Sequence, residues 1–319
     1  MKLQRHAYKL VGVLIILIAV GACSTPRQTL NIRQDPPSDI PLQQELVSTP
    51  FFPQEKYHCG PAALAMVINF RDIEVKPDEI VPLIYVPGRK GSLQEEVIAA
   101  ARRYDLLPVK LDGELKSILR EIASGNPVLV MQNLGLNFYP KWHYAVAVGY
   151  DLSEQTIVLR SGLNERLVRP FSLFERTWKR AGYWSLAIVP PGVIPSTVNT
   201  DGFLNTVIEF EQTGRSSPAY RAYLSAASKW PSSLMAQIGI GNTAYALGEY
   251  PKSESAYKKA LELSPEKAEV WNNLAYALVK QGKSTESLDA IGMALQISPD
   301  NTNYLESQAE LRQWTGKLN

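Results

Sequence analysis

Two side chains in this chain could form a nucleophile and its base, and the first of them is Cys59. It stands directly before Gly60-Pro61 and an almost wholly apolar run of alanine, leucine and methionine. That composition predicts a buried helix over 60–70, with Pro61 in its first turn. The amino end of a helix carries a partial positive charge, which stabilises a thiolate. Cys59 is therefore the candidate nucleophile.

The candidate base is His143, which opens the apolar run 143–150, a predicted strand. An imidazole there could take the thiol proton and deliver it to the leaving amine. His58 is the other histidine beyond the N-terminal segment, but neighbouring side chains in extended backbone point apart. We therefore assign the base to His143. Gln54, five residues before Cys59, could add an amide donor to an oxyanion site formed by backbone N–H groups.

Gln54, then Cys59-Gly60 with its apolar helix, and the later His143 together resemble the papain-like cysteine peptidases. The pattern is most similar to the peptidases that remove double-glycine leaders from bacteriocins. The resemblance covers about residues 48–190 and implies an α+β peptidase domain over 51–190. It implies cleavage of peptide bonds through a thioester, with Cys59, His143 and Gln54 in the roles given above. Those leader peptidases are commonly fused to export transporters. This sequence shows no such segment, so their substrate is not carried over.

The family places an Asp or Asn on the strand after the histidine, and here the sequence departs from it. Asp151 lies roughly 26 Å along the strand from His143, at about 3.3 Å per residue. A hairpin folded about the turn 151–154 brings residues 160–164 opposite His143. Ser161, favoured by register, or Asn164, favoured by chemistry, would orient the imidazole. Neither carries a charge, so we expect slower catalysis than with a carboxylate.

Other patterns place the remaining elements of residues 51–190. Ser92 to Glu95 form a predicted capping box for a helix that runs to about Tyr104. A further helix is expected over 113–124, and strands over 128–134, 156–161 and 183–189. The proline-rich residues 191–199 predict a stiff linker.

Residues 200–319 are a repeat with a period of 34 residues. Three series keep this interval: Pro231, Pro265 and Pro299; Gly214, Gly248, Gly282 and Gly316; Ala226, Ala260 and Ala294. The period is typical of tetratricopeptide (TPR) repeats, and we expect an all-α solenoid with units over 200–233, 234–267 and 268–301 and a capping helix over 302–319. Tyr223 and Tyr257 fill the large aromatic position, which Ile291 takes in the third unit. The glycines are expected just past each first helix and the prolines just past each second one.

The N-terminus has the pattern of an export signal. Three basic residues precede an apolar run that ends in Val20-Gly21-Ala22-Cys23, which predicts a signal peptide over 1–22. The small residues before the cysteine resemble a bacterial lipoprotein cleavage site, which implies a lipid on Cys23. An uncleaved anchor is the alternative. Ser24 after the cysteine implies, by the same resemblance, the outer membrane facing the periplasm. Residues 23–50, rich in Pro, Gln, Ser and Thr, predict a tether.

Composition excludes several function classes. Without residues 1–22 the chain carries 30 basic and 31 acidic residues, so charge offers no case for a nucleic-acid partner. Two cysteines and three histidines in all leave no basis for a four-ligand zinc site. No phosphate-binding glycine loop is present, and we expect no cofactor.

These observations predict a lipid-anchored cysteine peptidase of the bacterial envelope. Its repeats would recruit a peptide or protein on their concave face, or serve only for packing and oligomerisation. Two other functions stay open for the first domain. It could be a weak or inactive peptide-binding module, or an amidase acting on cell-wall peptides by the same chemistry.

Overall fold

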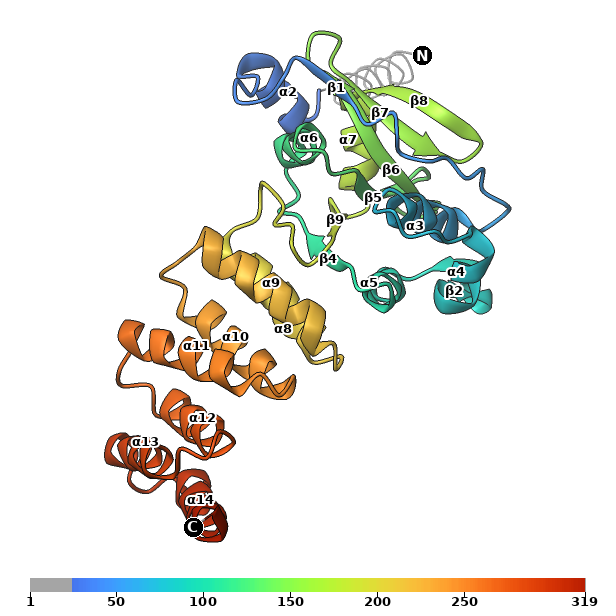
Figure 1. Cartoon of the computed structure of the whole chain (residues 1–319). Coiled ribbons are helices and arrows are strands. Elements are labelled where there is room, and N and C mark those ends of the chain that lie inside the picture. The colour runs from blue at the N-terminus through green and yellow to red at the C-terminus, as the bar shows by residue number, and fades with distance from the viewer. Residues whose placement is uncertain (1–24, 319) are drawn as a thin grey trace, which may run out of the picture.

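The computed structural model describes residues 25–318 (Figure 1). The predicted signal peptide at 1–22 and the lipid site at Cys23 lie outside these described residues. Within them, no helix is both long enough and apolar enough to cross a membrane. An α+β domain comes first and an array of paired helices follows, as the sequence predicts.

The α+β domain is built on an antiparallel sheet with the order β4-β9-β5-β6-β7-β8, and β1 pairs with β6 outside this path. The strands are β1 (Gln43–Glu45), β4 (Leu107–Lys110), β5 (Val128–Asn133), β6 (Trp142–Asp151), β7 (Thr156–Ser161), β8 (Asn164–Pro170) and β9 (Ser185–Val189). From His143 to Tyr150, every residue of β6 is buried. A strand covered on both faces needs such a continuous apolar run, so β6 is the centre of the core.

Helices cover both faces of this sheet. The helix α3 (Cys59–Asn69) packs on β6 from one side, and α6 (Leu115–Ala123) and α7 (Phe171–Lys179) pack from the other (Figure 1). Between α3 and the sheet edge lie α4 (Pro77–Ile84), the hairpin of β2 (Tyr85–Val86) and β3 (Gly91–Ser92), and α5 (Gln94–Arg103). Every residue of α3 from Gly60 to Ile68 is buried, which explains its apolar sequence.

Two local predictions need correction. The capping box at Ser92 is wrong, because Ser92 ends strand β3 and α5 begins after Leu93 with no side-chain cap. The tether over 23–50 is also wrong for much of its length. Residues Arg27–Gln34 form helix α2, in which Thr29 and Ile32 are buried, and β1 continues the sheet. The few buried residues of this segment are too sparse to stand out against its polar composition.

The second part is a stack of helix pairs. These are α8 (Thr200–Glu211) with α9 (Ser216–Lys229), α10 (Leu234–Ala246) with α11 (Tyr250–Leu263), and α12 (Ala268–Val279) with α13 (Ser284–Ile297); α14 (Thr302–Leu318) follows. The turns within the pairs contain Gly214, Gly248 and Gly282, at φ of 81°, 76° and 74°. These left-handed positions favour glycine. Gly316 lies inside α14, so the predicted turn at that residue is wrong.

Two further glycines explain the aromatic position of the repeat. The ring of Tyr223 in α9 lies over Gly239, and the ring of Tyr257 in α11 lies over Gly241. A β-carbon at either glycine would overlap the tyrosine ring. Both tyrosines are buried, so the helix α10 is packed tightly between its neighbours.

The first repeat is joined to the α+β domain by a shared core. Phe203, Val207 and Phe210 of α8 belong to the same buried cluster as the residues of β4 and β9. The linker is held as well, because the buried carboxylate of Glu121 accepts hydrogen bonds from Ser196 Oγ and from the N–H and hydroxyl of Thr197, at 2.8–3.0 Å. The two parts are therefore connected rigidly.

Candidate active site

Cys59 begins the buried helix α3 at the point where that helix meets β6. The backbone N–H groups of Tyr144, Gly60 and Cys59 itself are placed to stabilise its thiolate, yet burial outweighs them and raises the pKa of the Cys59 thiol above its usual 9.0. The structure therefore corrects the expectation of a stabilised thiolate. The positive end of the helix is present, but the cost of removing the thiolate from water exceeds the stabilisation that these N–H donors provide.

The start of α3 is packed closely against the β2–β3 hairpin. A β-carbon at Gly60 would stand 2.6 Å from Ser92 Oγ and 2.8 Å from Ser92 Cβ. The hydroxyl of Tyr144 donates to the carbonyl of Ser92 at 3.3 Å. The position after the nucleophile therefore needs a glycine for space, and β6 and the hairpin together hold the end of the helix.

His143 lies in β6 and is 9% exposed. Its Nε2 is 2.8 Å from the hydroxyl oxygen of Ser161, at the end of β7, so Nδ1 is left for a second partner. The residue after it, Tyr144, directs its N–H to the Cys59 thiol. Burial, together with the nearby charge of Lys141, lowers the pKa of His143 to about 4. The imidazole is therefore neutral at physiological pH and able to accept a proton.

The register of the β6–β7–β8 meander decides between the two orienting residues. Ser161 contacts the imidazole and is 7% exposed. Asn164 pairs with Ser161 across the following turn at the start of β8, and it is exposed. Of the two residues predicted from sequence, the structure therefore joins only Ser161 to His143.

Gln54 lies beside the same turn. Its backbone N–H donates to the carbonyl of Gly162 at 3.1 Å, and the residue is half-buried. This bond fixes the segment before Cys59 next to the end of β7, which carries Ser161. The main chain of Gln54 is thus anchored at the site, while the oxyanion role of its side chain stays a prediction.

Comparison with known families agrees with the fold. A model described as the Peptidase_C39 like family matches residues 40–186, and two models of TPR repeats match residues 241–282 and 268–301. The first match identifies a Peptidase_C39-like domain over residues 40–186. The chain therefore joins a C39-like domain to TPR repeats.

Other similarities are short or distant. The chain is 38% identical over 63 residues to the peroxisomal targeting signal receptor of Candida albicans, and 33% identical over 63 residues to that of Kluyveromyces lactis. Each match covers 20% of this chain and 11% of the relative, so the chain spans about a tenth of the length of these curated relatives. Among solved structures, the first TPR domain of human RPAP3 is 13% identical with a TM-score of 0.36, covering 37% of this chain and 94% of that one. The Yersinia enterocolitica chaperone SycD, in complex with a peptide of the translocator YopD, is 13% identical with a TM-score of 0.34, covering 37% and 90%.

The other histidine of the C39-like domain is held away from a catalytic role. His58 Nδ1 lies 3.7 Å from a carboxylate oxygen of Glu55, and its ring packs edge-on against Tyr85 at 5.2 Å between centroids. These contacts engage the ring of His58 and one of its nitrogens. They favour His143 as the base.

Sequence reasoning missed two contributors to the site. The N–H of Tyr144 is a main-chain group, which no residue type reveals, and only the packing of α3 on β6 points it at the thiol. Lys141 was also missed, although its position two residues before His143 was a usable signal. Its charge adds to the effect of burial in lowering the pKa of the His143 imidazole.

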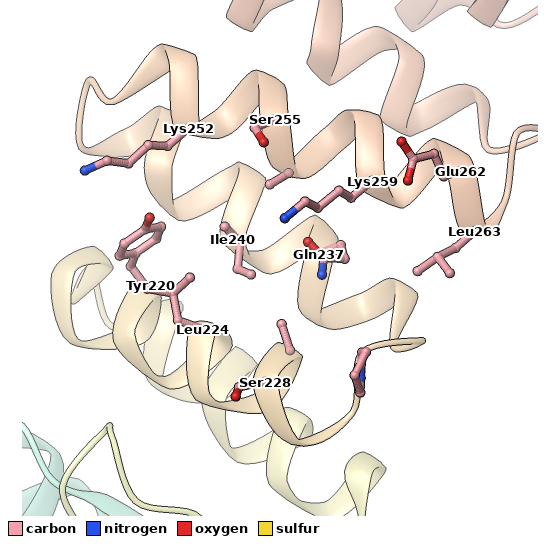
Figure 2. A pocket seen from close by; sticks show the side chains of 13 residues that line it. Tyr220, Leu224, Ser228, Gln237, Ile240, Lys252, Ser255, Lys259, Glu262 and Leu263 are labelled. Atoms are coloured by element: carbon pink, nitrogen blue, oxygen red, sulfur yellow. The ribbon is translucent and has the colours of Figure 1, made fainter.

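The TPR repeats carry a groove of about 590 Å³, drawn in Figure 2. Its sides are α9 and α11 and its floor is α10, which contributes Gln237 and Ile240. Lys252 and Lys259 extend from α11 along one side, opposite Tyr220 and Leu224 of α9. The concave binding face expected from the repeat pattern stays a prediction.

Proposed function

We propose that this protein is a cysteine peptidase whose nucleophile is Cys59 and whose general base is His143. The observation that carries the proposal is the buried contact of His143 Nε2 with Ser161 Oγ at 2.8 Å. It fixes the imidazole in a C39-like domain, one residue from the backbone amide that faces the Cys59 thiol.

The proposed reaction begins from a neutral thiol and a neutral imidazole. Nδ1 of His143 removes the proton as the sulfur of Cys59 attacks the carbonyl carbon of the peptide bond. The backbone N–H groups at the start of α3, with the side-chain amide of Gln54, stabilise the oxyanion. The imidazolium then protonates the leaving amine, and a thioester remains on Cys59. Water, activated by the same imidazole, hydrolyses the thioester and restores the thiol.

Ser161 acts in this scheme as the positioning residue of the imidazole. With Nδ1 free to accept a proton, Nε2 carries the hydrogen and donates it to the Ser161 hydroxyl oxygen. A hydroxyl fixes the tautomer but adds no negative charge to stabilise the imidazolium. We therefore propose a slow peptidase, suited to a restricted set of substrates that the rest of the chain recruits.

The TPR repeats and the N-terminal segment suggest how substrate is recruited and where the protein is located. The TPR repeats support binding of a peptide or protein partner, which would bring substrate to the C39-like domain. We propose further that Cys23 carries a lipid and holds the protein in the bacterial envelope, at the outer membrane facing the periplasm. The sequence Val20-Gly21-Ala22-Cys23 supports the lipid, and Ser24 after the cysteine supports the outer membrane.

A catalytically inactive peptide-binding domain is the second candidate. Two observations favour it: burial raises the pKa of the Cys59 thiol, and the partner of His143 is an uncharged hydroxyl. An amidase acting on cell-wall peptides would use the same residues as the peptidase and differ only in the bond that it cleaves.

A peptide library separates these functions. The wild-type chain, Cys59→Ala and His143→Ala would each be incubated with the library, and products and retained peptides identified by mass spectrometry. The peptidase predicts products with the wild type alone and retained peptides with Cys59→Ala. Retention without products in all three proteins would establish the binding module instead, and products from all three would overturn the assignment of Cys59.

A further inference from the structure

The hairpin that joins β5 to β6 presents its large apolar side chains to solvent. This segment, residues 134–142, is called the aromatic hairpin below. Phe138 is 85% exposed, Tyr139 79% and Trp142 52%. Leu134 and Leu136 are 46% and 56% exposed. Such a gathering of apolar side chains on a folded surface marks an interaction site.

The aromatic hairpin is firmly built. The side-chain oxygen of buried Asn133 accepts hydrogen bonds from the N–H groups of Gly135 and Lys141, each at 2.9 Å. Leu136 and Tyr139 exchange backbone hydrogen bonds of 3.1 Å across the turn. A β-carbon at Gly135 would overlap the carbonyl of Tyr139. The exposure of the aromatic rings is therefore imposed by an ordered backbone.

Basic side chains border the aromatic hairpin. A pocket of about 620 Å³ at its base is lined by Asn133, Asn137, Trp142, Arg176, Lys179 and Arg180. None of these six residues is acidic. The guanidinium of Arg180 donates to the carbonyl of Asn133 at 2.9 and 3.1 Å, which fixes the end of α7 against the hairpin. With exposed Lys141 and Lys179, the border is cationic.

The start of the described chain lies against the middle of α7. Gln28 and Thr29 donate to the carboxylate of Glu175, in the middle of α7. Arg33 donates to Gln155, whose carbonyl accepts the N–H of Phe171 at the beginning of α7. Helix α2 therefore runs antiparallel to α7, with its first turn beside the middle of α7.

This arrangement limits where a lipid on Cys23 can be. Gln28 is the fifth residue after Cys23, a reach of at most about 18 Å. A bilayer that held such a lipid would lie within that reach of the middle of α7, the helix whose end is bound to the aromatic hairpin through Arg180. Apolar rings with a cationic border fit the boundary between acyl chains and anionic headgroups.

We propose that the aromatic hairpin and the basic end of α7 dock on a phospholipid bilayer that carries anionic headgroups. The proposal rests in part on the proposed lipid at Cys23, because such a tether would hold the domain at the bilayer and raise the effective concentration of the docking surface there. Trp142 immediately precedes His143, so docking places the active site at the membrane surface. Substrates would then be peptides presented at or near that surface.

The experiment uses the chain from Ser24 to Asn319 without a lipid, so that only the surface is tested. Cosedimentation would be measured with phosphatidylcholine vesicles, with and without phosphatidylglycerol. We expect binding to the anionic vesicles that weakens about fivefold or more in Lys179→Glu and more strongly in the double variant Phe138→Ser with Tyr139→Ser. Leu305→Ser on α14 and Lys110→Glu on β4 change exposed residues elsewhere and should bind like the wild type.

A second readout identifies the docking face. Brominated lipids should quench part of the tryptophan fluorescence, and Trp142→Phe should remove that part. Circular dichroism confirms that each variant is folded. Absence of vesicle binding, or binding equal in all variants, would overturn the docking surface. The intact mass of the protein purified from membranes tests the lipid on Cys23 separately, so failure of the lipid anchor and failure of the surface are distinguishable.

Discussion

Burial controls the chemistry of Cys59 and His143. It raises the pKa of the thiol and lowers that of the imidazole to about 4, so both groups are neutral at rest. Papain-like chemistry can start from this state because proton transfer and attack occur together. The uncharged Ser161 is consistent with it, since a carboxylate beside Nε2 would favour the imidazolium instead. Three predictions follow from these side chains.

The imidazole of His143 should titrate near pH 4. Its folded-state pKa lies below the usual 6.5, so the neutral base persists until pH falls to about 4. As the pH falls, His143 takes up a proton in the unfolded chain before it does so in the folded one. Its contribution to the free energy of unfolding is therefore complete above about pH 6.5, and the stability falls by up to about 3 kcal/mol toward pH 4. NMR titration of the histidine ring protons, assigned by their loss in His143→Gln, measures the pKa. Lys141→Gln should raise it, whereas Lys110→Gln should not. Titration near 6.5 in the wild type would contradict the prediction.

The Cys59 thiol should react slowly at neutral pH. In the chain from Ser24 it is the single cysteine, so alkylation by iodoacetamide reports on it alone. We expect a rate at pH 7 below that of a model peptide cysteine, rising through and beyond pH 9, because burial disfavours the thiolate. The wild type unfolded in urea is the matched control and should react like the peptide. Fast labelling at pH 7 that levels off would show a preformed thiolate–imidazolium pair.

Peptide cleavage should depend on the hydroxyl of Ser161 and not on the side-chain amide of Asn164. Ser161→Ala removes the partner of Nε2 at 2.8 Å, a hydrogen bond worth about 1 kcal/mol. We therefore expect peptide cleavage to fall about fivefold or more, in kcat more than in KM. Asn164→Ala changes an exposed side chain at the adjacent position and is the matched control. Equal activity of the wild type and both variants would show that Ser161 has no role in catalysis.

At the scale of elements, close packing around glycine positions both the nucleophile and the repeats. Gly60 allows the β2–β3 hairpin to pack against the start of α3, and Gly239 and Gly241 allow α10 to fit against two tyrosine rings. In each case a residue with no side chain sets the distance between two elements.

Gly60→Ala should therefore destabilise the α+β domain by about 1–3 kcal/mol, because its β-carbon would overlap Ser92. Gly292→Ala in α13 is the matched control, since no atom lies within 4 Å of its β-carbon. It should be neutral or stabilising by up to about 1 kcal/mol. Urea unfolding measures both. Adding Ser92→Gly to Gly60→Ala should restore part of the loss, and an unchanged double variant would show that the overlap is not the cause.

At the scale of the whole molecule, the C39-like domain and the first repeat share one core. Glu121 links them through three hydrogen bonds to Ser196 and Thr197. Ion pairs of Arg102 with Glu209 and Arg215 with Asp105 add surface contacts. The repeats are therefore held at a defined place relative to the C39-like domain.

Glu121→Leu should loosen this connection. It removes the acceptor of Ser196 and Thr197 and also leaves the buried amide of Asn126 without its partner, at a cost of about 1–3 kcal/mol. We expect faster proteolysis within residues 191–199 and separate unfolding of the two parts. Glu262→Leu, on the exposed side of α11, should leave both readouts as in the wild type. A linker equally resistant in Glu121→Leu would show that the shared core alone holds the parts together.

The sequence by itself determined the paired-helix array, the buried helix behind Cys59, and the two side chains of the proposed reaction. Each of these rests on periodicity or on residue type, which are local properties of the chain. Only the tertiary structure decided that Ser161 contacts His143, that the amide of Tyr144 faces the thiol, and that residues 27–46 pack on the domain. These depend on strand register and on burial, which are set by segments far apart in sequence. Burial also reversed the expected charge of the thiol, because loss of water outweighs the helix terminus that the sequence reveals.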